Sequence, residues 1–438
     1  MNVTDIVTIT PGLARGRVVI PPSKSVAHRA LICAALASRG CVSRLGGMPY
    51  NQDIDATMDC LRALGVRMTD EREASGETRC VTVFGCGGQW TKNDEPLSCR
   101  ESGSTLRFLL PLCLLSDAPR TLKGSERLLA RPLDDYRSLF EGREWTSVEG
   151  GLRIGGGSVL RGQTFSLSGK SSSQFITGLL FVLPLLDEDS VIELPSAPES
   201  KSYIDMTIAV QAHFGVIATW QDDTHLIVKG GQTYRAADMT ADGDASGAAF
   251  FYASGAAFFY ALDTLKSGGE PLEIVCAGSD DVRQGDAVCP SLLAQIAAAS
   301  PDRLPVISLA DCPDLGPILF TAAAALHGAI FTHTDRLRLK ESDRISAMVQ
   351  ELEKFGARFK VIDGVDGGRV TVLPPEGGLH TPTGVLRGHN DHRVVMSLAV
   401  LSACMSDPTP IRIDDAHAVT KSFPDFFDRL RKLGVVCE

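Results

Sequence analysis

Leu61-Arg62-Ala63-Leu64-Gly65-Val66 ends one helical pattern and begins a strand pattern, and the same order of residue types returns three times in the chain. In each copy an amphipathic helix ends near a glycine, which tolerates the left-handed backbone that closes many helices. A small or β-branched residue then begins an extended segment. The other three copies span residues 211–216, 352–357 and 430–435.

The glycines of these copies recur at a nearly constant interval. Gly65, Gly142 and Gly215 are 77 and 73 residues apart, and Gly356 and Gly434 are 78 apart. The copy around Gly142 is degraded, and residues 292–299 offer a sixth. Self-similarity at a fixed period predicts assembly from one supersecondary unit, and six units of about 73 residues would fill the chain. Each unit is expected to mix helices with strands.

Composition and charge limit the classes of partner. The chain has 438 residues, of which 44% are hydrophobic and 22% charged, as in an ordinary globular protein. This length exceeds the size at which one hydrophobic core stops growing, so two domains are expected. The net charge of −10 leaves no broad basic field for nucleic acid or an acidic membrane. An anionic small molecule would need cations that are gathered locally.

Several signals predict a reduced, cytoplasmic protein. Twelve cysteines show no C-x-x-C spacing and no paired framework, and the first ten residues lack the features of a signal or transit peptide. The longest apolar run, residues 175–186, is interrupted by Thr177, Gly178 and Pro184 and is too short to cross a bilayer. No His, Cys and Asp cluster has metal-ligand spacing, so neither a metal nor another cofactor is expected.

One octapeptide occurs twice in tandem. The sequence of residues 245–252 is repeated without change in residues 253–260. We interpret this as a recent duplication or a sequence artefact. Eight more helical residues would add about 12 Å and turn the register by roughly 80°. The second copy is therefore expected either to extend a helix past its packing site or to loop out.

The charged segment Arg338-Leu339-Lys340-Glu341-Ser342-Asp343-Arg344 predicts a ligand site. If it opens a helix, Lys340 and Arg344 share one face with Glu341 beside it. Two cations aimed at one point suit a phosphate or carboxylate, and a neighbouring carboxylate can exchange protons with the ligand. The alternative for such a run in isolation is an exposed helix with ion pairs.

Three hydroxyl-rich turns each precede an apolar helix. They are Ser23-Lys24-Ser25 with Arg29, Ser102-Gly103-Ser104 with Arg107, and residues 169–174, which end in Ser172-Ser173-Gln174. Such turns offer amide, hydroxyl and cationic donors to an anion, although helix capping alone is the simpler explanation of each one. Ser23 and Ser25 are both candidate caps.

The C-terminal half adds acidic and basic candidates. Asp314 follows Pro313, Lys421 precedes Ser422, and Arg393 opens an apolar helix, where an anion contact is favourable. His392 beside it is interpreted as a structural hydrogen-bonding residue rather than a base.

Taken together, these motifs resemble the EPSP synthase (3-phosphoshikimate 1-carboxyvinyltransferase) family. They occur in the family order from residue 23 to residue 425, which is nearly the whole chain. The matching positions are Ser23-Lys24-Ser25, Arg29, Gly103-Ser104, Arg107, Glu126-Arg127, Arg131-Pro132, Ser172-Ser173-Gln174, Ser200-Lys201, Tyr203-Ile204-Asp205, Gly243-Asp244-Ala245-Ser246, Pro313-Asp314, Leu339-Lys340-Glu341-Ser342-Asp343-Arg344, Asn390-Asp391-His392-Arg393 and Lys421-Ser422-Phe423-Pro424.

The resemblance implies an α/β fold, a two-domain inverse α/β barrel built from six βαβαββ repeats. One domain would be discontinuous, from residues 1–21 and 238–438, and the middle domain would span 22–237. The active site would lie in the cleft between the domains. The resemblance also implies a monomer with small-molecule substrates, without nucleic acid or membrane partners.

The implied reaction transfers the enolpyruvyl group of phosphoenolpyruvate to the 5-hydroxyl of shikimate 3-phosphate and releases phosphate. Asp314 would be the general base, Glu341 would protonate the methylene carbon, and Lys24 would assist catalysis. The resemblance implies shikimate 3-phosphate contacts from Lys24, Ser25, Arg29, Ser172, Ser173, Ser200, Asp314 and Lys340. It implies phosphoenolpyruvate contacts from Lys24, Gly103, Arg127, Gln174, Arg344, Arg393 and Lys421.

The chain departs from the family pattern at three places. Glu101 stands where the family often has Asn, and Arg336 stands where it often has a polar or acidic residue. Residues 141–151 lack a clear helix-to-strand pattern, which predicts an abbreviated second unit in the middle domain.

Two alternatives stay open. UDP-N-acetylglucosamine enolpyruvyl transferase shares the fold and phosphoenolpyruvate, but it uses a Lys-Asn pair and a Cys in a Gly-rich loop, whereas Lys24 is followed here by Ser25. An inactive phosphate-ligand binding homologue, in which the octapeptide has broken domain closure, is the other.

Overall fold

A computed structural model describes residues 5–12, 14–116, 118–155, 160–167, 172–241, 243–253, 272–276, 284–300, 302–364 and 367–438. The chain divides into two compact units, each with its own hydrophobic core. Unit 1 comprises residues 1–21, 243–277 and 285–438, and unit 2 comprises residues 22–242 and 278–284.

Unit 2 contains three repeats of one strand–helix–strand–helix–strand–strand pattern. In chain order its elements are α1 (Lys24–Leu36), β3 (Val42–Pro49), α2 (Gln52–Ala63), β4 (Arg67–Arg72), β5 (Thr78–Phe84), β6 (Leu97–Ser98), α3 (Gly103–Leu112), η1 (Cys113–Leu115), β7 (Arg120–Lys123), α4 (Glu126–Leu129), α5 (Asp134–Leu139), β8 (Glu144–Val148), β9 (Gly151–Gly155), β10 (Thr164–Ser166), α6 (Ser173–Val182), η2 (Leu183–Leu185), β11 (Ser190–Glu193), α7 (Lys201–His213), β12 (Ala218–Trp220), β13 (His225–Val228) and β14 (Met239–Thr240).

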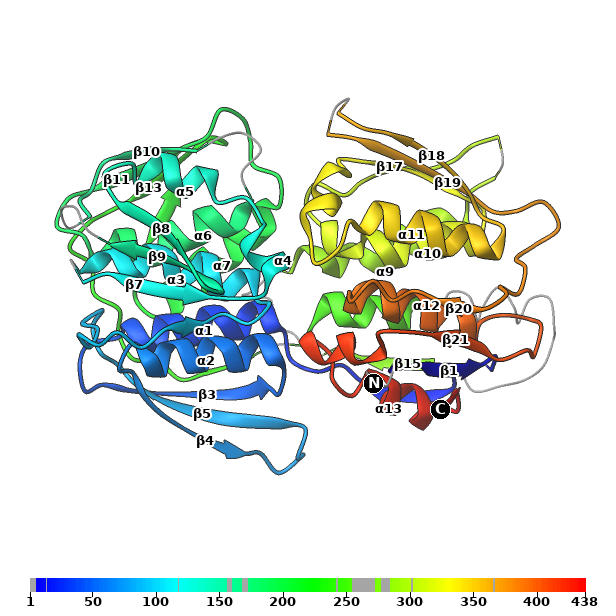
Figure 1. The fold of residues 1–438 in the computed structure, drawn as a ribbon, viewed down its shortest axis with the longest axis horizontal. Helices are drawn as coiled ribbons and strands as arrows, with labels where there is room; N and C mark the ends of the chain where they lie inside the picture. Colours follow the sequence, from blue (N-terminus) through cyan, green and yellow to red (C-terminus); the bar gives the residue numbers. More distant parts are fainter. Residues whose placement is uncertain are drawn as a thin grey trace. The chain divides into compact units, whose positions relative to one another are not determined.

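Unit 1 repeats the pattern, and a helix over 245–253 carries no label in Figure 1. The labelled elements are β1 (Val7–Thr10), β2 (Gly16–Val19), β15 (Leu272–Val275), η3 (Gly285–Val288), α9 (Cys289–Ala297), β16 (Val306–Ser308), η4 (Pro313–Leu315), α10 (Gly316–Ala325), β17 (Ala329–Thr332), η5 (Asp335–Leu339), α11 (Arg344–Leu352), η6 (Glu353–Phe355), β18 (Arg358–Ile362), β19 (Arg369–Leu373), β20 (Val385–Leu386), α12 (His392–Ala403), β21 (Ile411–Ile413), η7 (Ala416–Lys421), α13 (Phe426–Lys432) and β22 (Val436–Cys437).

The same strand order recurs in five four-stranded sheets of the described residues. In the sheet β6-β7-β9-β8, the first pair is parallel and the next two pairs are antiparallel. The sheets β10-β11-β13-β12, β14-β3-β5-β4, β16-β17-β19-β18 and β20-β21-β1-β22 follow this plan. In the sixth sheet, the parallel pair β2 and β15 is described. The predicted α/β class and the repeated unit are therefore confirmed.

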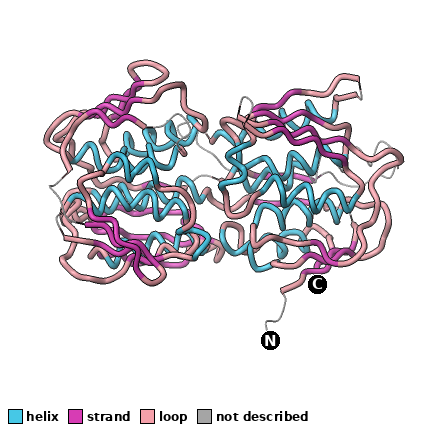
Figure 2. The backbone as a smooth tube through the Cα atoms, turned by 45° about the horizontal axis from the view of Figure 1, so that its top comes forward, coloured by secondary structure: helices cyan, strands magenta, loops and turns pink. Residues whose placement is uncertain are grey.

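The helices lie inside each unit and the sheets lie on its outside (Figures 1 and 2). Every residue of α12 is buried, as is every residue of α1 from Val26 to Leu36, so these helices have no solvent-facing side. In β5, by contrast, fully buried residues alternate with half-buried ones. Buried helices under one-sided sheets form the inverted arrangement that the resemblance implies.

The glycines of the repeat have the conformation that the sequence predicts. Gly65, Gly215, Gly356 and Gly434 all have φ between 80° and 95°, in the left-handed region. Gly356 directly follows its 3₁₀ helix, and the other three lie two residues after the end of their helices. The repeat that contains Gly142 is indeed abbreviated, since its second helical segment is split into α4 and α5, of four and six residues. Its strand β8 is largely exposed, which explains the missing apolar pattern.

The predicted domain boundary at residues 237 and 238 lies too early for unit 2. Met239 and Thr240 still pair in parallel with Leu45 and Gly46 of β3, so they belong to the first sheet of unit 2. The first copy of the duplicated octapeptide is helical. Residues 254–260 of the second copy lie outside the described residues. No helix of the described part of the chain is long and apolar enough to cross a membrane.

Candidate functional site

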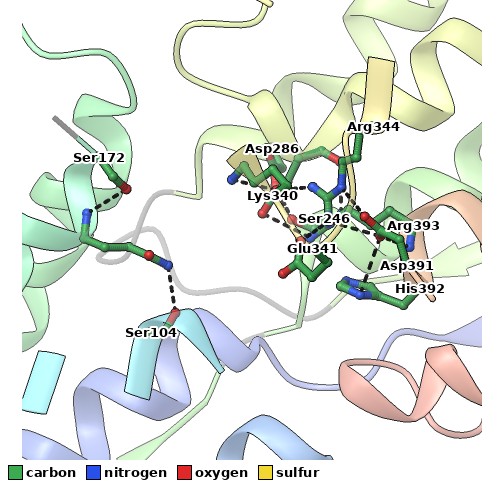
Figure 3. A network of polar contacts seen from close by, with 12 residues as sticks. Ser104, Ser172, Ser246, Asp286, Lys340, Glu341, Arg344, Asp391, His392 and Arg393 are labelled. Carbon is green, nitrogen blue, oxygen red and sulfur yellow. Dashed lines mark hydrogen bonds and ion pairs between the residues drawn. The ribbon is translucent and has the colours of Figure 1, made fainter. Parts of the chain in front are cut away.

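Arg344 forms the centre of a charged cluster in unit 1 (Figure 3). It begins α11, and its buried guanidinium reaches three carboxylates. Nη1 lies 2.9 Å from Oδ1 of Asp314, Nη2 lies 2.7 Å from Oε2 of Glu341, and Nε lies 2.8 Å from Oδ2 of Asp391. Burial opposes the charge, but the three carboxylates outweigh it and raise the pKa of Arg344. This cation stays charged at any working pH.

Asp314 is ion-paired with three cations. It lies in η4 at the start of α10, where the helix dipole favours a negative charge. Besides Arg344, Lys340 Nζ lies 3.2 Å from Oδ1 and Arg393 Nη2 lies 3.2 Å from Oδ2. Arg393 also donates to the main-chain oxygen of Asp314 at 3.1 Å. The cluster thus holds more positive groups around Asp314 than this carboxylate can neutralise.

Lys340 has a lowered pKa. Burial is the largest cause, and the positive charges of Arg344 and Arg336 add to it, whereas Asp314 opposes the shift. Arg336, one of the departures from the family pattern, therefore acts electrostatically on this lysine. An anion that bound at Lys340 would relieve the repulsion among these cations.

The predicted helical geometry of residues 340–344 is wrong. The segment is not helical between the end of η5 at Leu339 and the start of α11 at Arg344. Lys340 has an extended backbone, with φ −86° and ψ −161°. Lys340 and Arg344 nevertheless meet, because both contact Oδ1 of Asp314. Asp343 caps α11, as expected for a helix-entry residue, by accepting from the amide of Ser346.

Asp391 is a member of the cluster that we did not predict. It is fully buried and caps α12, because its Oδ1 accepts a hydrogen bond from the amide of Arg393 at 3.0 Å. Its Oδ2 accepts a hydrogen bond from Ser342 Oγ at 3.0 Å. Burial opposes its ionisation, but the positive charge of Arg344 dominates and lowers the pKa of Asp391. Its place inside the Asn-Asp-His-Arg motif was the only signal available in the sequence.

Lys421 is held by an unusual turn. Its Nζ donates to the main-chain oxygen of Asn390 at 2.7 Å and to Oδ1 of the same residue at 2.9 Å. Asn390 and His389 are consecutive non-glycine residues with φ of 49° and 53°. This left-handed backbone costs most residues roughly 1–2 kcal/mol, although Asn tolerates it better than His does. Strain of this kind persists only where the surrounding structure fixes it, which is common at ligand sites.

A second unpredicted carboxylate lies in the same unit. Asp286 is buried and accepts a hydrogen bond from Ser246 Oγ. Burial, followed by the negative charge of Asp314, raises the pKa of Asp286 to about 6, although Arg393 acts in the opposite direction. Ser246 belongs to the quoted Gly-Asp-Ala-Ser motif, but nothing in the sequence joins it to a residue forty positions away.

Lys24 begins α1 in unit 2 and pairs with α2. Its Nζ lies 2.8 Å from Oδ2 of Asp53, and both side chains are mostly buried. Ser23 occupies the N-cap position without a side-chain cap bond, so the predicted capping by a serine is wrong here. The buried Oγ of Ser23 has no hydrogen-bond partner among the described residues. The turn therefore presents both a cation and a hydroxyl.

Arg29 is one turn further along α1 and is satisfied within unit 2. Its Nε donates to Thr207 Oγ1 at 2.8 Å, Nη1 to the oxygen of Ser25 at 2.7 Å, and Nη2 to the oxygen of Tyr203 at 3.0 Å. Burial lowers the pKa of Arg29 to about 10, which still leaves it charged at neutral pH. Through Ser25 and Tyr203, it joins the start of α1 to that of α7.

Gln174 is locked in one amide orientation. Arg107 Nη1 donates to its Oε1 at 2.7 Å, and its Nε2 donates to Ser104 Oγ at 3.1 Å. Arg107, the cation of the second predicted turn, is buried and also lies over the ring of Phe175. The starts of α3 and α6 are thus joined by side chains from two of the predicted turns.

Gly103 leaves room for a neighbouring arginine. A Cβ at this position would lie 2.6 Å from Nη1 of Arg131. Arg131 is half-buried, whereas Arg127, the predicted phosphoenolpyruvate contact, is exposed. The absence of a side chain at Gly103 therefore sets where the Arg131 guanidinium can lie.

The predicted serines lie at helix starts of unit 2. Ser172 caps α6, accepting from the amide of Gln174, and Ser173 is its first residue. Ser200 precedes α7, is buried and has a left-handed backbone with φ 57°. Residues 168–171, which include part of the predicted Gly-Lys-Ser turn, lie outside the described residues.

A buried hydroxyl chain that sequence reasoning missed connects three helices of unit 2. His28 Nδ1 lies 2.8 Å from Thr57 Oγ1, which lies 2.7 Å from Thr105 Oγ1, and this hydroxyl contacts Ser102 Oγ at 2.7 Å. Burial, aided by Lys24 and Arg29, lowers the pKa of His28 and keeps the imidazole neutral. These contacts fix α1, the middle of α2 and the start of α3 relative to one another.

The arrangement of each unit suits anionic ligands. Among the described residues, no group of three or more His, Cys, Asp and Glu side chains could hold a metal ion. Unit 1 offers Lys340, Arg344 and Arg393, which contact the acids Asp314 and Glu341 directly, and also Lys421, which contacts Asn390. Cations with adjacent carboxylates can bind phosphate or carboxylate groups and move protons.

The fold is that of the enolpyruvyl transferases. The structure is similar to an EPSP synthase from Acinetobacter baumannii, with a TM-score of 0.73, 22% identity and 99% of each chain covered. It is also similar to the enolpyruvyl transferase NikO from Streptomyces tendae, with a TM-score of 0.68, 15% identity and 99% and 98% covered.

Sequence relatives give the family. The model of the EPSP synthase (3-phosphoshikimate 1-carboxyvinyltransferase) family matches residues 10–430. A 3-phosphoshikimate 1-carboxyvinyltransferase from Clostridium kluyveri is 36% identical over 444 residues, which cover 98% of this chain and 97% of that protein. One from Clostridium beijerinckii is 36% identical over 439 residues, with the same coverage. The chain belongs to the EPSP synthase family, as its motifs predict.

Proposed function

We propose that this protein transfers the carboxyvinyl group of phosphoenolpyruvate to the 5-hydroxyl of shikimate 3-phosphate, with release of phosphate. The observation that carries the proposal is that Asp314 is ion-paired with Lys340, Arg344 and Arg393 in a chain of this family. The two substrates together bring two phosphates and two carboxylates. Clustered cations are what such a pair of ligands needs in a protein of net charge −10.

The proposed chemistry uses two carboxylates. Asp314 takes the proton of the 5-hydroxyl while the oxygen of that hydroxyl attacks C2 of phosphoenolpyruvate. Glu341 donates a proton to C3, which becomes a methyl group. The resulting tetrahedral adduct loses phosphate as the Glu341 carboxylate takes a proton from C3, which restores the double bond. Arg344 contacts both acids in unit 1, so it fixes their separation before any ligand arrives.

The proposed binding residues divide by substrate. For phosphoenolpyruvate we propose Lys24, Gly103, Arg127, Gln174, Arg344, Arg393 and Lys421. For shikimate 3-phosphate we propose Lys24, Ser25, Arg29, Ser172, Ser173, Ser200, Asp314 and Lys340. Both units contribute to each set, so the proposal requires both of them. The orientation of Gln174 by Arg107 and Ser104 supports a preformed polar contact.

The proposed setting is a cytoplasmic monomer that acts on small molecules without a cofactor. The net charge of −10 supports the choice of small-molecule partners, because it disfavours binding to nucleic acid or to an acidic membrane. Sedimentation at working concentration tests the monomer, and a dimer would contradict it.

One assay tests the function. The protein is mixed with phosphoenolpyruvate and shikimate 3-phosphate, and released phosphate is measured. Release that depends on both substrates is the expected result. Release with UDP-N-acetylglucosamine in place of shikimate 3-phosphate would identify the sister activity instead. Binding of shikimate 3-phosphate without release would identify an inactive homologue.

A further inference from the structure

Helix α11 carries a second buried charge that the proposed chemistry does not use. Glu351 follows Arg344 by seven residues, which is about two helical turns and places both on one side of the helix. Each of these side chains is only 1% exposed. A buried carboxylate needs partners that offset the loss of solvation.

Glu351 finds those partners in its own helix end and in the loop before α12. Its Oε2 accepts from the amide of Arg387 at 2.9 Å and from Lys354 Nζ at 2.6 Å. Its Oε1 lies 3.5 Å from Nε2 of His389. Burial opposes ionisation, but His389, Lys354 and the Arg387 amide outweigh it and lower the pKa of Glu351. The carboxylate is ionised at neutral pH.

The loop that Glu351 binds contains the strained turn. His389 and Asn390 are its two consecutive left-handed residues. On its other side the loop is held by Asp414, which accepts from the amide of Gly388 at 2.6 Å, and by Asp415, which accepts from the amide of Asn390 at 2.8 Å. The loop is therefore fixed between α11 and residues 414–415.

The same loop sets the direction of three cations. Asn390 accepts hydrogen bonds from Lys421 Nζ on its main-chain oxygen and on Oδ1. Asp391 receives Arg344 and also caps the helix that begins with His392 and Arg393. A displacement of residues 387–391 would thus move the partners of Lys421, Arg344 and Arg393 together.

We propose that Glu351 is a positioning residue for the phosphoenolpyruvate-binding cations: it ties the loop 387–391 to α11 and so holds Lys421, Arg344 and Arg393 in their binding geometry. This inference rests on the proposed function for the identity of the ligand. The attachment of the loop 387–391 to α11 by Glu351, which we call the clamp, rests on contacts within unit 1. Glu351 acts through Asn390 and Asp391 and does not touch a substrate.

The test is Glu351→Gln, which keeps the size and one acceptor but removes the charge. We expect the KM for phosphoenolpyruvate to rise about 10-fold and kcat to change less than about 3-fold, because misplaced cations weaken binding. The KM for shikimate 3-phosphate should change less than about 2-fold. The matched control is Glu353→Gln, an exposed residue two positions later, which should leave every constant unchanged.

Hydrogen exchange supplies a readout that does not depend on turnover. Amides in residues 387–391 should exchange at least about 10-fold faster in Glu351→Gln than in the unmodified chain, while those of β17 should not change. Equal exchange in residues 387–391 would overturn the clamp, whether or not the protein is active. An unchanged KM for phosphoenolpyruvate beside an active unmodified enzyme would overturn the positioning role alone. Absence of phosphate release by the unmodified chain would overturn the proposed function instead.

Discussion

Arg344 lies 2.9 Å from Asp314 although thirty residues separate them in the chain. The contact joins the start of α11 to the start of α10, so it depends on how the two helices of one repeat pack in unit 1. A base that is ion-paired before substrate arrives is oriented, but it must exchange these partners for the substrate hydroxyl.

Asp314→Asn should remove most activity without unfolding the protein. The amide cannot accept the 5-hydroxyl proton, and it leaves Lys340 and Arg393 without their shared counter-charge. Phosphate release should fall at least about 100-fold. The control, Asp311→Asn at an exposed position three residues earlier, should keep full activity. A residual rate above about one tenth would contradict the assigned base.

Glu341→Gln should stop proton delivery to C3. The side chain would still accept a hydrogen bond from Arg344, so the cluster keeps its shape. In deuterated water, the unmodified enzyme should exchange deuterium into the C3 methylene of phosphoenolpyruvate, and the variant should lose both exchange and turnover by at least about 100-fold. Undiminished exchange, followed by mass spectrometry, would assign the proton to another group.

Lys24→Met should slow the reaction, because it removes a proposed catalytic cation that belongs to unit 2. The change removes the cation and leaves Asp53, its partner at 2.8 Å, as a mostly buried negative charge near the start of α1. We expect kcat/KM for phosphoenolpyruvate to fall at least about 100-fold, with circular dichroism unchanged. Lys92→Met, at an exposed loop position, is the control. Equal kinetics in both variants would remove Lys24 from the site.

Gly103→Ala should disturb Arg131. The added methyl would lie 2.6 Å from its Nη1, so the guanidinium must move. Since we place phosphoenolpyruvate near Gly103, its KM should rise about 10-fold. The control is Gly142→Ala, where a Cβ meets nothing within 4 Å and φ is not positive. If both variants bind phosphoenolpyruvate like the unmodified chain, Gly103 does not adjoin the ligand.

Asp286→Asn should change how stability depends on pH. Asp286 has a pKa of about 6 in the folded protein and an ordinary value of 3.8, so between these values the folded state keeps a proton that the unfolded state has released. The contribution of Asp286 to the free energy of unfolding therefore has its largest value below pH 3.8. It decreases as the pH rises and is absent above a pH of about 6. The whole loss is at most about 3 kcal/mol.

Urea unfolding at pH 4, 5, 6 and 7 checks this assignment. The stability of Asp286→Asn relative to the unmodified chain should increase across the series, because Asn stays neutral and can still accept from Ser246. A pH-independent difference would show that Asp286 is already ionised in the folded protein at pH 4.

The repeat could be predicted because each copy marks its own end locally. The left-handed conformation occurs at Gly65, Gly215, Gly356 and Gly434. A glycine in the sequence is enough to predict it. Pairings between distant segments could not be predicted in the same way. The parallel contact of β14 with β3 joins residues almost two hundred positions apart, and no local pattern encodes such a partner.

The candidate site was predictable where a motif concentrates charge. Lys340, Glu341 and Arg344 stand in one segment, and they do form one cluster with Asp314. The expected helical spacing does not explain why Lys340 and Arg344 lie close together. They meet because both contact Asp314. Asp391 and Asp286 were missed because a carboxylate's role depends on which cations the fold brings to it. The buried His28–Thr57 contact is equally invisible along the chain.

The two chain ends belong to one sheet. Strand β1 pairs with β21 and β22, and Thr8 and Glu438 exchange two main-chain hydrogen bonds, of 2.7 and 2.9 Å. During synthesis, residues 22–242 of unit 2 leave the ribosome while unit 1 still consists of its first 21 residues. Strand β1 therefore stays without both of its partner strands until residues 411–413 and then 436–437 have been synthesised. A circular permutant that joins the two ends and opens elsewhere would remove that delay.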